Sequence, residues 1–339
     1  MQIVTVMGID LAKSVFHLHG VTSSGKVVVK KKLSREALGA FMRKLEPCLV
    51  GIEACGGANY WAREFRKMGH TVKAMAPQFV KPYRKNSKND FNDAEAICEA
   101  VTRPNMRFVP IKEVEHQDMQ SLHRVRSRLV ASRTALVNEI RGILLEYGII
   151  LPKPKKKFSK ALVEIIHADS KQLTEAMKDL MRNLYDEYTE IEKNMSVYND
   201  KIEVIFESNE VCKRIAKVEG VGPITATAIC ASVSDAKMFK NGRQFAAWLG
   251  LVPGQDTTGG KEKLGGITKR GDKYIRQLLV HGGRSAILHA SNKTDTKSKW
   301  MIEKKKTRGF NRASVAVANK NARVIWALMA NGTEYRVPA

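Results

Sequence analysis

The stretch IVTVMGID, residues 3–10, decides the fold of the first part of the chain, because it is mostly apolar and ends on an aspartate. A short apolar run of this kind predicts a buried strand. SVFHLHGV, residues 14–21, and KVVVKKKL, residues 26–33, predict two further strands joined by a turn at residues 23–25. The three strands together predict a meander.

Helix and strand patterns alternate from there to about residue 112. EALGAFMRKL (36–45) and ANYWAREFRKMG (58–69) predict helices, whereas LVGIEA (49–54) and TVKAMA (71–76) predict strands. A meander followed by alternating helices and strands predicts a mixed α/β sheet.

The middle of the chain, residues 113–208, is predicted to form two long helices. In the second helix, apolar residues recur at alternating steps of three and four, the spacing of a coiled coil. This seam consists of Met177, Met181, Leu184, Tyr188, Ile191, Met195, Tyr198, Ile202 and Ile205. An antiparallel hairpin within one chain and a helix pairing between chains both fit. A basic, proline-containing linker is predicted near residues 152–160.

The remaining residues, 209–339, are predicted to be mainly helical with glycine-rich interruptions. A chain of 339 residues is long enough for two or three domains. The patterns predict three: an α/β domain at 1–112, coiled-coil helices at 113–208 and a helical domain at 209–339.

The charge of the chain indicates a polyanionic partner. It has 58 Lys and Arg against 34 Asp and Glu, a formal net charge of +24, and nucleic acid is the usual reason for so large a basic excess. We expect no membrane association, because no apolar run reaches eighteen residues and the N-terminus lacks the pattern of a signal peptide. Five scattered cysteines without a C-x-x-C pair favour a reducing, cytoplasmic location.

Four carboxylates are candidates for one cluster. Asp10 and Glu53 end predicted strands, and Asp90 and Asp93 are three residues apart, so a helix would place them on one face. Such a cluster repels itself unless it holds cations, and its oxygen ligands suit Mg²⁺ or Mn²⁺ in phosphoryl transfer. The alternative is structural: Asp90 as an N-cap with Asp93 stabilising the first turn, and Glu53 as an ordinary strand-end acid.

A possible phosphate contact lies in VEGVGPITATAI, residues 218–229. Gly220 and Gly222 form a tight turn before Pro223, a residue suited to opening a helix. The turn is similar to the helix-hairpin-helix motif, whose backbone N–H groups contact phosphates. A helix–helix turn of any purpose would also use these glycines. The flanking basic residues are Lys213, Arg214 and Lys217.

A second candidate is the glycine-rich loop within GLVPGQDTTGGKEKLGGITKRGDKYIRQLL, residues 250–279. It is not a phosphate-binding Walker loop, because Glu262 follows Lys261 where that motif needs Ser or Thr. A threonine hydroxyl there could attack a phosphodiester. The cations available to neutralise the developing charge are Lys261, Lys263, Lys269 and Arg270. The alternative is a flexible basic loop with exposed threonines.

Several long motifs occur together in one order. They are GIDLAKSVF, VGIEACGGANYWARE, MAPQFVKPYRKNSKNDFNDAEAICEAVTRPNMRFVP, VEGVGP, GRQFAAWLGLVP and GGITKRGDKYIRQLLVHGGRSAI. With them the chain resembles the DEDD transposases of bacterial insertion sequences, which are related to the Piv/MooV invertases and are bridge-RNA-guided recombinases.

The resemblance implies a RuvC-like N-terminal domain of RNase H fold, a coiled-coil insertion and a C-terminal transposase domain. It implies that Asp10, Glu53, Asp90 and Asp93 are the DEDD acids. It also implies that a hydroxyl in the C-terminal loop forms a covalent protein–DNA intermediate, beside the metal site of another subunit, and that a structured RNA encoded by the element pairs with target and donor DNA.

This chain departs from the family at the nucleophile. Its loop reads DTTGG where members usually have a serine before the glycines, so Thr258 best matches that position. Threonine can act as a nucleophile, but its extra methyl group crowds the attack. A natural variant, an engineered attenuation and a nucleophile elsewhere in the chain all remain open.

The expected function is therefore RNA-guided recombination that excises and inserts a mobile element. The expected partners are donor and target double-stranded DNA, the guide RNA, and further copies of this chain in a dimer or tetramer, because strand exchange needs at least two active sites. A bacterial, nucleoid-associated location follows. The alternatives are a metal-dependent junction-resolving nuclease that uses water, and a non-catalytic nucleic-acid-binding protein.

Overall fold

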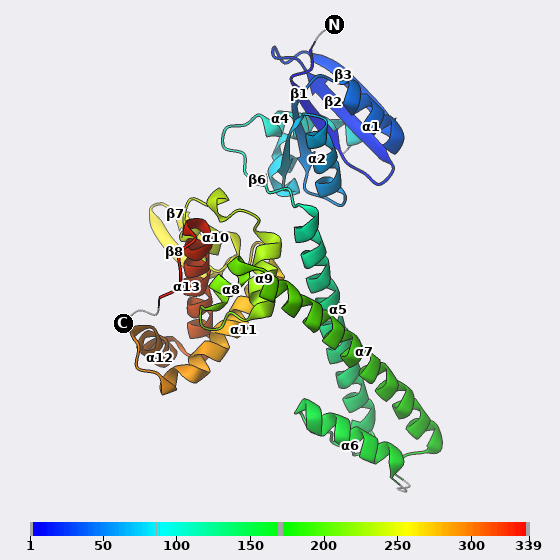
Figure 1. Cartoon of the computed structure of the whole chain (residues 1–339), viewed down its shortest axis with the longest axis vertical. Coiled ribbons are helices and arrows are strands. Elements are labelled where there is room, and N and C mark those ends of the chain that lie inside the picture. Colours follow the sequence, from blue (N-terminus) through cyan, green and yellow to red (C-terminus); the bar gives the residue numbers. More distant parts are fainter. Residues whose placement is uncertain (1–2, 86, 88, 169–171, 337–339) are drawn as a thin grey trace. The chain divides into compact units, whose positions relative to one another are not determined.

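The computed structural model describes residues 3–85, 87, 89–168 and 172–336 (Figure 1). Internal contacts divide the chain into two units, Met1–Val114 and Glu115–Ala339. The boundary between the units lies at the start of a long helix, and the three-domain division at residues 112 and 208 stays a prediction. Both sides of residue 208 lie in the second unit.

The first unit is built on a six-stranded mixed sheet. Its strands are β1 (Val6–Asp10), β2 (Val15–Val21), β3 (Val27–Ser34), β4 (Leu49–Glu53), β5 (Thr71–Met75) and β6 (Phe108–Val109), in the order β3-β2-β1-β4-β5-β6. The meander β1–β3 is antiparallel, β4 and β5 run parallel to β1, and the short β6 closes the edge. This mixed sheet is consistent with an RNase H-like fold. The two-residue β6 was not expected from the sequence.

Helices cover the two faces of the sheet differently. On one face, the core residues Met7 and Ile9 of β1 belong to one apolar cluster with side chains of α1 (Arg35–Lys44) and α2 (Ala58–Lys67). On the other face lies α4 (Asp90–Val101), after the short α3 (Pro77–Val80) and the 3-10 turn η1 (Lys81–Tyr83). The face covered by α4 is the one that concerns function.

Two glycines let α4 approach the sheet closely. Gly8 of β1 and Gly51 of β4 are direct neighbours in the parallel register. A Cβ added to Gly8 would lie 2.3 Å from the Ala94 carbonyl oxygen, and one added to Gly51 would lie 2.8 Å from Cβ of Val101. Both distances are well inside van der Waals contact, so the helix rests on bare backbone. This contact holds the first turn of α4 near the carboxyl end of β1.

Three helices open the second unit: α5 (Val114–Leu145), α6 (Lys155–His167) and α7 (Glu175–Ser208). The pairs Arg126–Asn199 and Arg133–Glu192 show that α5 and α7 run antiparallel. Seam residues of α7, among them Met181 and Met195, share an apolar cluster with α5 and α6. The seam is therefore occupied within the chain, and a coiled-coil supercoil stays a prediction. The expected linker near 152–160 is wrong in its second half, because Lys155 begins α6.

The rest of the second unit is mainly helical, as predicted. Its helices are α8 (Glu210–Ala216), α9 (Pro223–Ser232), α10 (Gly242–Trp248), α11 (Lys273–His289), α12 (Thr296–Arg308) and α13 (Phe310–Asn331), with the 3-10 turns η2 (Ala236–Met238) and η3 (Ala290–Asn292). One apolar cluster joins α8 to α11 and α13. Within the described ranges, no helix is both long and apolar enough to cross a membrane.

A chain of hydrogen bonds ties α5, α9 and α11 together. His123 of α5, whose exposed fraction is 3%, lies between Tyr274 and Thr227. Its Nδ1 is 3.2 Å from the Tyr274 hydroxyl, and its Nε2 is 3.0 Å from Oγ1 of Thr227. Because Thr227 donates its own proton to the Pro223 carbonyl at 2.7 Å, its oxygen accepts from His123 Nε2–H, and Nδ1 is left to accept from Tyr274. Each hydrogen bond of this series thereby has one donor and one acceptor, and the imidazole of His123 is neutral.

Acidification is expected to destabilise the second unit through His123. Burial first, and then the charge of Arg126, lower the pKa of His123 from 6.5 to about 4. The unfolded chain therefore binds more protons between these values, so the contribution is complete above pH 6.5 and is lost as the pH falls toward 4. From about pH 7 to about pH 5 we expect a loss of roughly 2 kcal/mol in the free energy of unfolding.

The measurement is urea unfolding of the wild type and of His123→Gln at both pH values. The variant should lose most of this dependence, because it has no imidazole to protonate. His167→Gln, at an exposed position on α6, is the matched control and should keep the wild-type dependence. Equal slopes in the wild type and His123→Gln would contradict the assignment.

Candidate active site and nucleic-acid interface

The alternation of side chains along neighbouring strands places Asp10 and Glu53 on the same face of the sheet. In β1, Met7 and Ile9 point into the α1/α2 core, so Gly8 and Asp10 point to the opposite face. In β4, Val50 and Ile52 likewise point into that core, so Gly51 and Glu53 share the face with Asp10. Because β1 and β4 are parallel neighbours and each acid is the last residue of its strand, both acids lie at the carboxyl ends of these central strands. These ends face the first turn of α4.

The start of α4 adds two more acids. Asn89 is the N-cap, and its side chain accepts from the backbone N–H of Phe91 at 2.9 Å. Asp90 and Asp93 follow in the first turn. The structural alternative that made Asp90 the N-cap is therefore wrong, since Asn89 already satisfies that role. The helix dipole still favours both acids at this end.

Three of the four acids lie close enough to interact electrostatically. Burial is the largest cause that raises the pKa of Glu53, and the charges of Asp10 and Asp93 raise it further, while Arg84 opposes them. Arg84 Nη1 lies 3.4 Å from a carboxylate oxygen of Asp93. Asp10, Glu53 and Asp93 therefore form one electrostatically coupled group, which we call the acidic edge.

Asp90 has a different neighbour. Its carboxylate, 62% exposed, lies 3.6 Å from Nδ1 of His17. His17 is the partner of Asp10 in the β1–β2 register, and its ring packs edge-on against Phe91. The structure thus places Asp90 beside the acidic edge and turned toward β2. Neither His17 nor Arg84 was predicted as a site residue: the contact of His17 joins segments distant in the sequence, and that of Arg84 joins the start of α4 to the irregular segment before it.

The acidic edge has the donor chemistry of a divalent cation site. Its oxygens are hard ligands of the kind that Mg²⁺ and Mn²⁺ prefer. Burial is the largest cause of the raised pKa of Glu53, and the charges of Asp10 and Asp93 add to it; a bound cation would favour the ionised carboxylate against both effects. In the part of the chain that the structure describes, no three such side chains stand close enough together to hold a metal as they are. The donor set fits, and the side-chain arrangement of a loaded site stays a prediction.

Thr258 lies at the tip of a β-hairpin in the second unit. The expected flexible loop is wrong here: β7 (Pro253–Thr258) pairs antiparallel with β8 (Lys261–Ile267). The two turn residues, Gly259 and Gly260, both have positive φ, which a two-residue hairpin turn needs and glycine supplies without strain. Thr258 is exposed and pairs directly with Lys261. The threonine hydroxyl is therefore presented to the surroundings next to a cation.

The base of this hairpin is held firmly. Gly250 and Gly271 each lie so close to backbone atoms that a Cβ would collide, at 2.2 Å from the Arg270 oxygen and 1.8 Å from the Trp248 oxygen. The Arg276 guanidinium donates to the carbonyls of Leu249 and Arg270, each at 3.0 Å. Of the remaining predicted cations, Lys263 is exposed on β8, and Lys269 and Arg270 are exposed at the base. The hairpin is anchored at its base, and its two lysines lie beside two carboxylates, Asp256 opposite Lys263 and Glu262 next to Lys261.

The turn between α8 and α9 has a structural reason for one of its glycines. Gly220 has φ +82°, and a Cβ there would lie 2.3 Å from the Gly282 carbonyl oxygen of α11. Gly220 is thus needed for packing whether or not a phosphate binds. Gly222 is exposed and begins α9 without a side-chain cap, so N–H groups at this end stay available. The phosphate contact stays a prediction that now rests chiefly on Gly222.

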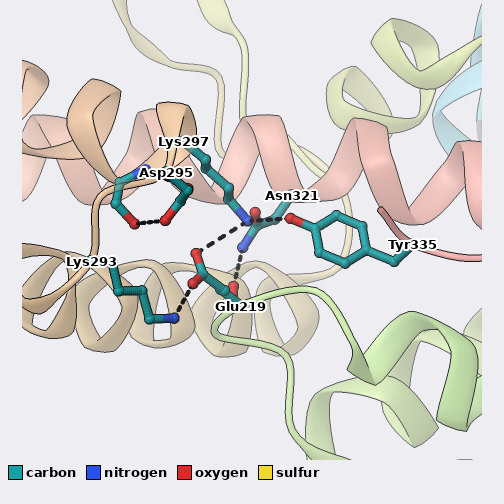
Figure 2. Close-up of polar contacts among 7 residues, drawn as sticks. Glu219, Lys293, Asp295, Lys297, Asn321 and Tyr335 are labelled. Atoms are coloured by element: carbon teal, nitrogen blue, oxygen red, sulfur yellow. Dashed lines mark hydrogen bonds and ion pairs between the residues drawn. The ribbon is translucent and has the colours of Figure 1, made fainter. Parts of the chain in front are cut away.

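A buried polar cluster fixes this turn (Figure 2). The Glu219 carboxylate pairs with Lys293 and lies 3.7 Å from Nζ of Lys297, whose exposed fraction is 3%. Lys297 also donates to the Tyr335 hydroxyl at 3.3 Å, and the Asn321 amide donates to the Glu219 carbonyl at 2.8 Å. Burial lowers the pKa of Lys297, and the charge of Glu219 opposes that shift. Removal of the Glu219 carboxylate would leave the buried Lys297 ammonium without its carboxylate partner, whereas removal of Lys297 would leave Glu219 still paired with Lys293.

The basic flank of the turn is partly neutralised within the chain. Glu334, after α13, pairs with Arg214 at 3.5 Å and also with Lys217, and Lys213 pairs with Glu207 and Glu210. These ion pairs are exposed and are expected to contribute little to stability. A bound phosphate would have to compete with Glu334 for Arg214 and Lys217.

Known proteins resemble the chain over nearly its whole length. Residues 7–149 match a family described as Transposase, and residues 212–299 match one described as Transposase IS116/IS110/IS902 family. A Pseudomonas aeruginosa protein named "Probable family 20 transposase" is 50% identical over 97% of this chain and 98% of its own length. The transposase for insertion sequence element IS1111A of Coxiella burnetii is 44% identical over 100% of this chain and 93% of its own length. That for IS1328 of Yersinia enterocolitica is 36% identical over 98% of both chains.

Proposed function

The chain belongs to the IS116/IS110/IS902 transposase family, and from this premise we propose that it excises and inserts its element by RNA-guided DNA strand cleavage and exchange. As a transposase it is an enzyme that acts on DNA. The observation that carries the rest is the acidic edge: three interacting carboxylates gathered by two parallel strands and the helix packed on them. Such a group suits the chemistry of phosphodiesters.

In this proposal Asp10, Glu53, Asp93 and Asp90 would hold Mg²⁺ or Mn²⁺. When bound, such a cation would supply positive charge beside the scissile phosphate. Arg84 would hold the Asp93 carboxylate in place before loading. The electrostatic coupling of Glu53 to Asp10 and Asp93 supports this assignment.

Thr258 is proposed as the nucleophile. Its Oγ1 would bond to phosphorus as the bond to the departing strand breaks, which leaves the chain covalently joined to DNA. Lys261, directly opposite in the hairpin, would neutralise the developing charge. Lys263, Lys269 and Arg270 would hold the flanking phosphates. The exposed tip suits an arm that reaches the acidic edge of another subunit, in a dimer or tetramer.

A structured RNA would supply sequence specificity in this proposal. Base pairing would select donor and target, while the basic surface of the protein would hold phosphates and duplex shape. The turn at Gly222 is proposed as one such backbone contact, in the manner of a helix-hairpin-helix. The net charge of +24 supports a large nucleic-acid footprint.

The test is to express the gene with its natural flanking DNA, purify the protein in high salt and sequence the RNA that stays bound. We expect one discrete RNA derived from the flank, with loops complementary to the insertion junctions. A parallel purification with the flank scrambled is the control and should yield no such RNA. Only random cellular RNA in both preparations would contradict guidance by RNA and would favour a self-sufficient junction-resolving nuclease.

A further inference from the structure

Two cavities in the second unit share one aromatic wall. The smaller, of about 240 Å³, lies between α5, α9 and α11, and the larger, of about 510 Å³, lies between α5, α7 and α11. Tyr274 lines both. The smaller volume is below the range of sites for drug-sized molecules and suits a single planar group. Neither cavity contains a residue assigned to the acidic edge or to the hairpin.

The shared wall is rigid. The Tyr274 hydroxyl is fixed by His123, which is fixed in turn by Thr227, so the ring is held by a hydrogen-bond chain that spans three helices. With its hydroxyl held in this way, Tyr274 contributes to the lining of both cavities. An aromatic side chain held in place is a platform on which a nucleobase stacks.

The smaller cavity also offers unused polar groups. Gln120, Ser127 and Ser232 line it, and within the described residues their side chains form no hydrogen bond. Asp272 contributes a carboxylate, one oxygen of which caps α11 by accepting from Ile275 N–H at 3.0 Å. A mixture of donors and acceptors beside small apolar side chains matches the edge and face of a base.

The larger cavity has an excess of positive charge. Arg126, Arg133 and Lys155 line it against the single carboxylate of Glu192, which pairs with both Arg133 and Lys155. Arg126 donates to Asn199 at 2.7 Å and forms no ion pair with a carboxylate among the residues that the structure describes. Three cations and one anion leave a net charge of two for phosphate groups.

We propose that these cavities bind one unpaired nucleotide of a single-stranded segment, with the base stacked on Tyr274 in the smaller cavity and its phosphates beside Arg126 in the larger. The inference rests on the proposed function in taking nucleic acid as the ligand. RNA and DNA share the base and the phosphate, so the structure assigns the chemistry common to both. A fully paired duplex does not fit, because its bases are stacked on one another and have no free face.

The experiment uses the full chain and three probes: single-stranded RNA, single-stranded DNA and duplex DNA of the same sequence, each with one photoreactive 5-iodouracil base. We expect a cross-link to a peptide of α11 that contains Tyr274, with the single-stranded probes alone. The stronger single-stranded arm identifies the natural source. Tyr274→Leu should weaken binding of that probe about tenfold, whereas Tyr274→Phe, which keeps the ring, should stay within about threefold.

The outcomes separate this inference from the proposed function. Single-stranded binding that is unchanged in Tyr274→Leu, with cross-links only outside α11, would overturn the inference and leave the proposed function intact. An equal α11 cross-link with the duplex would also overturn it. If no nucleic acid binds at all, the proposed function fails and the inference fails with it. Should Tyr274→Leu fail to fold, the second variant is Ser232→Phe. Its larger side chain would fill part of the smaller cavity, so we expect it to abolish the cross-link.

Discussion

Replacement of Asp10 by Asn is expected to reduce DNA strand cleavage by roughly a thousandfold or more while DNA binding persists. The amide has nearly the shape of the carboxylate, so β1 and its pairing with β4 should be retained. What is lost is one of the negative charges that couple to Glu53 at the acidic edge. A cation held by the remaining acids would be bound less tightly and placed less well.

The measurement combines a cleavage assay on the element's junction DNA with a binding assay at the same salt concentration. Glu36→Gln, at an exposed site in the first turn of α1 on the other side of the sheet, is the matched control and should cleave normally. Unchanged cleavage by Asp10→Asn would favour a non-catalytic nucleic-acid-binding protein, which can lose these acids without effect.

A second reading of the same variant is independent of activity. Because the Asp10 charge raises the pKa of Glu53, its removal should lower that pKa, although burial, the larger cause, keeps it above the ordinary range. Titration of Glu53 by NMR would show the change. Should the pKa of Glu53 stay the same, the two carboxylates do not interact and the acidic edge is wrongly drawn.

The sequence was enough to place the acids on their elements, and the structure was needed to place them together. Asp10 and Glu53 end short apolar runs, and such runs are recognisable as buried strands from local composition. The parallel pairing of β1 with β4 joins segments about forty residues apart, and its register decides that the two acids are neighbours. No local pattern contains that register. The close approach of α4 over Gly8 and Gly51 is likewise a fact of packing.

The two wrong predictions, a loop at DTTGG and a linker that continues to residue 160, have the same origin. The DTTGG segment looked like a loop because glycine and threonine were read singly, but its two glycines form the turn of a hairpin whose strands pair in register. The basic residues 155–160 suggest a linker because Pro152 and Pro154 precede their lysines, yet Phe158 and Leu162 bury one face of α6 against α7. In both places, contacts with a neighbouring element override the local composition.

Replacement of Thr258 by Ala is expected to abolish the covalent protein–DNA species and to reduce strand exchange by roughly a thousandfold or more. Alanine keeps the strand position and the pairing with Lys261 but has no oxygen to form a bond with phosphorus. Thr258 is exposed at the end of β7, and the adjacent glycine turn carries no side chains that would obstruct a phosphate. DNA binding should be unaffected, because the cations of the hairpin remain.

Thr258→Ser provides the sharper half of this test. Serine has the same hydroxyl without the methyl group that restricts χ1 and crowds an in-line attack, so its activity should equal or exceed that of the wild type. Thr257→Ala is the matched control, since Thr257 is the neighbouring threonine and its hydroxyl contacts only Gln255 within the described residues. The adduct is detected as DNA that remains with the protein after denaturation. An adduct that survives Thr258→Ala but not Thr257→Ala would identify Thr257 as the nucleophile. Normal cleavage without any adduct would identify water as the attacking group and leave the hairpin a DNA-holding arm.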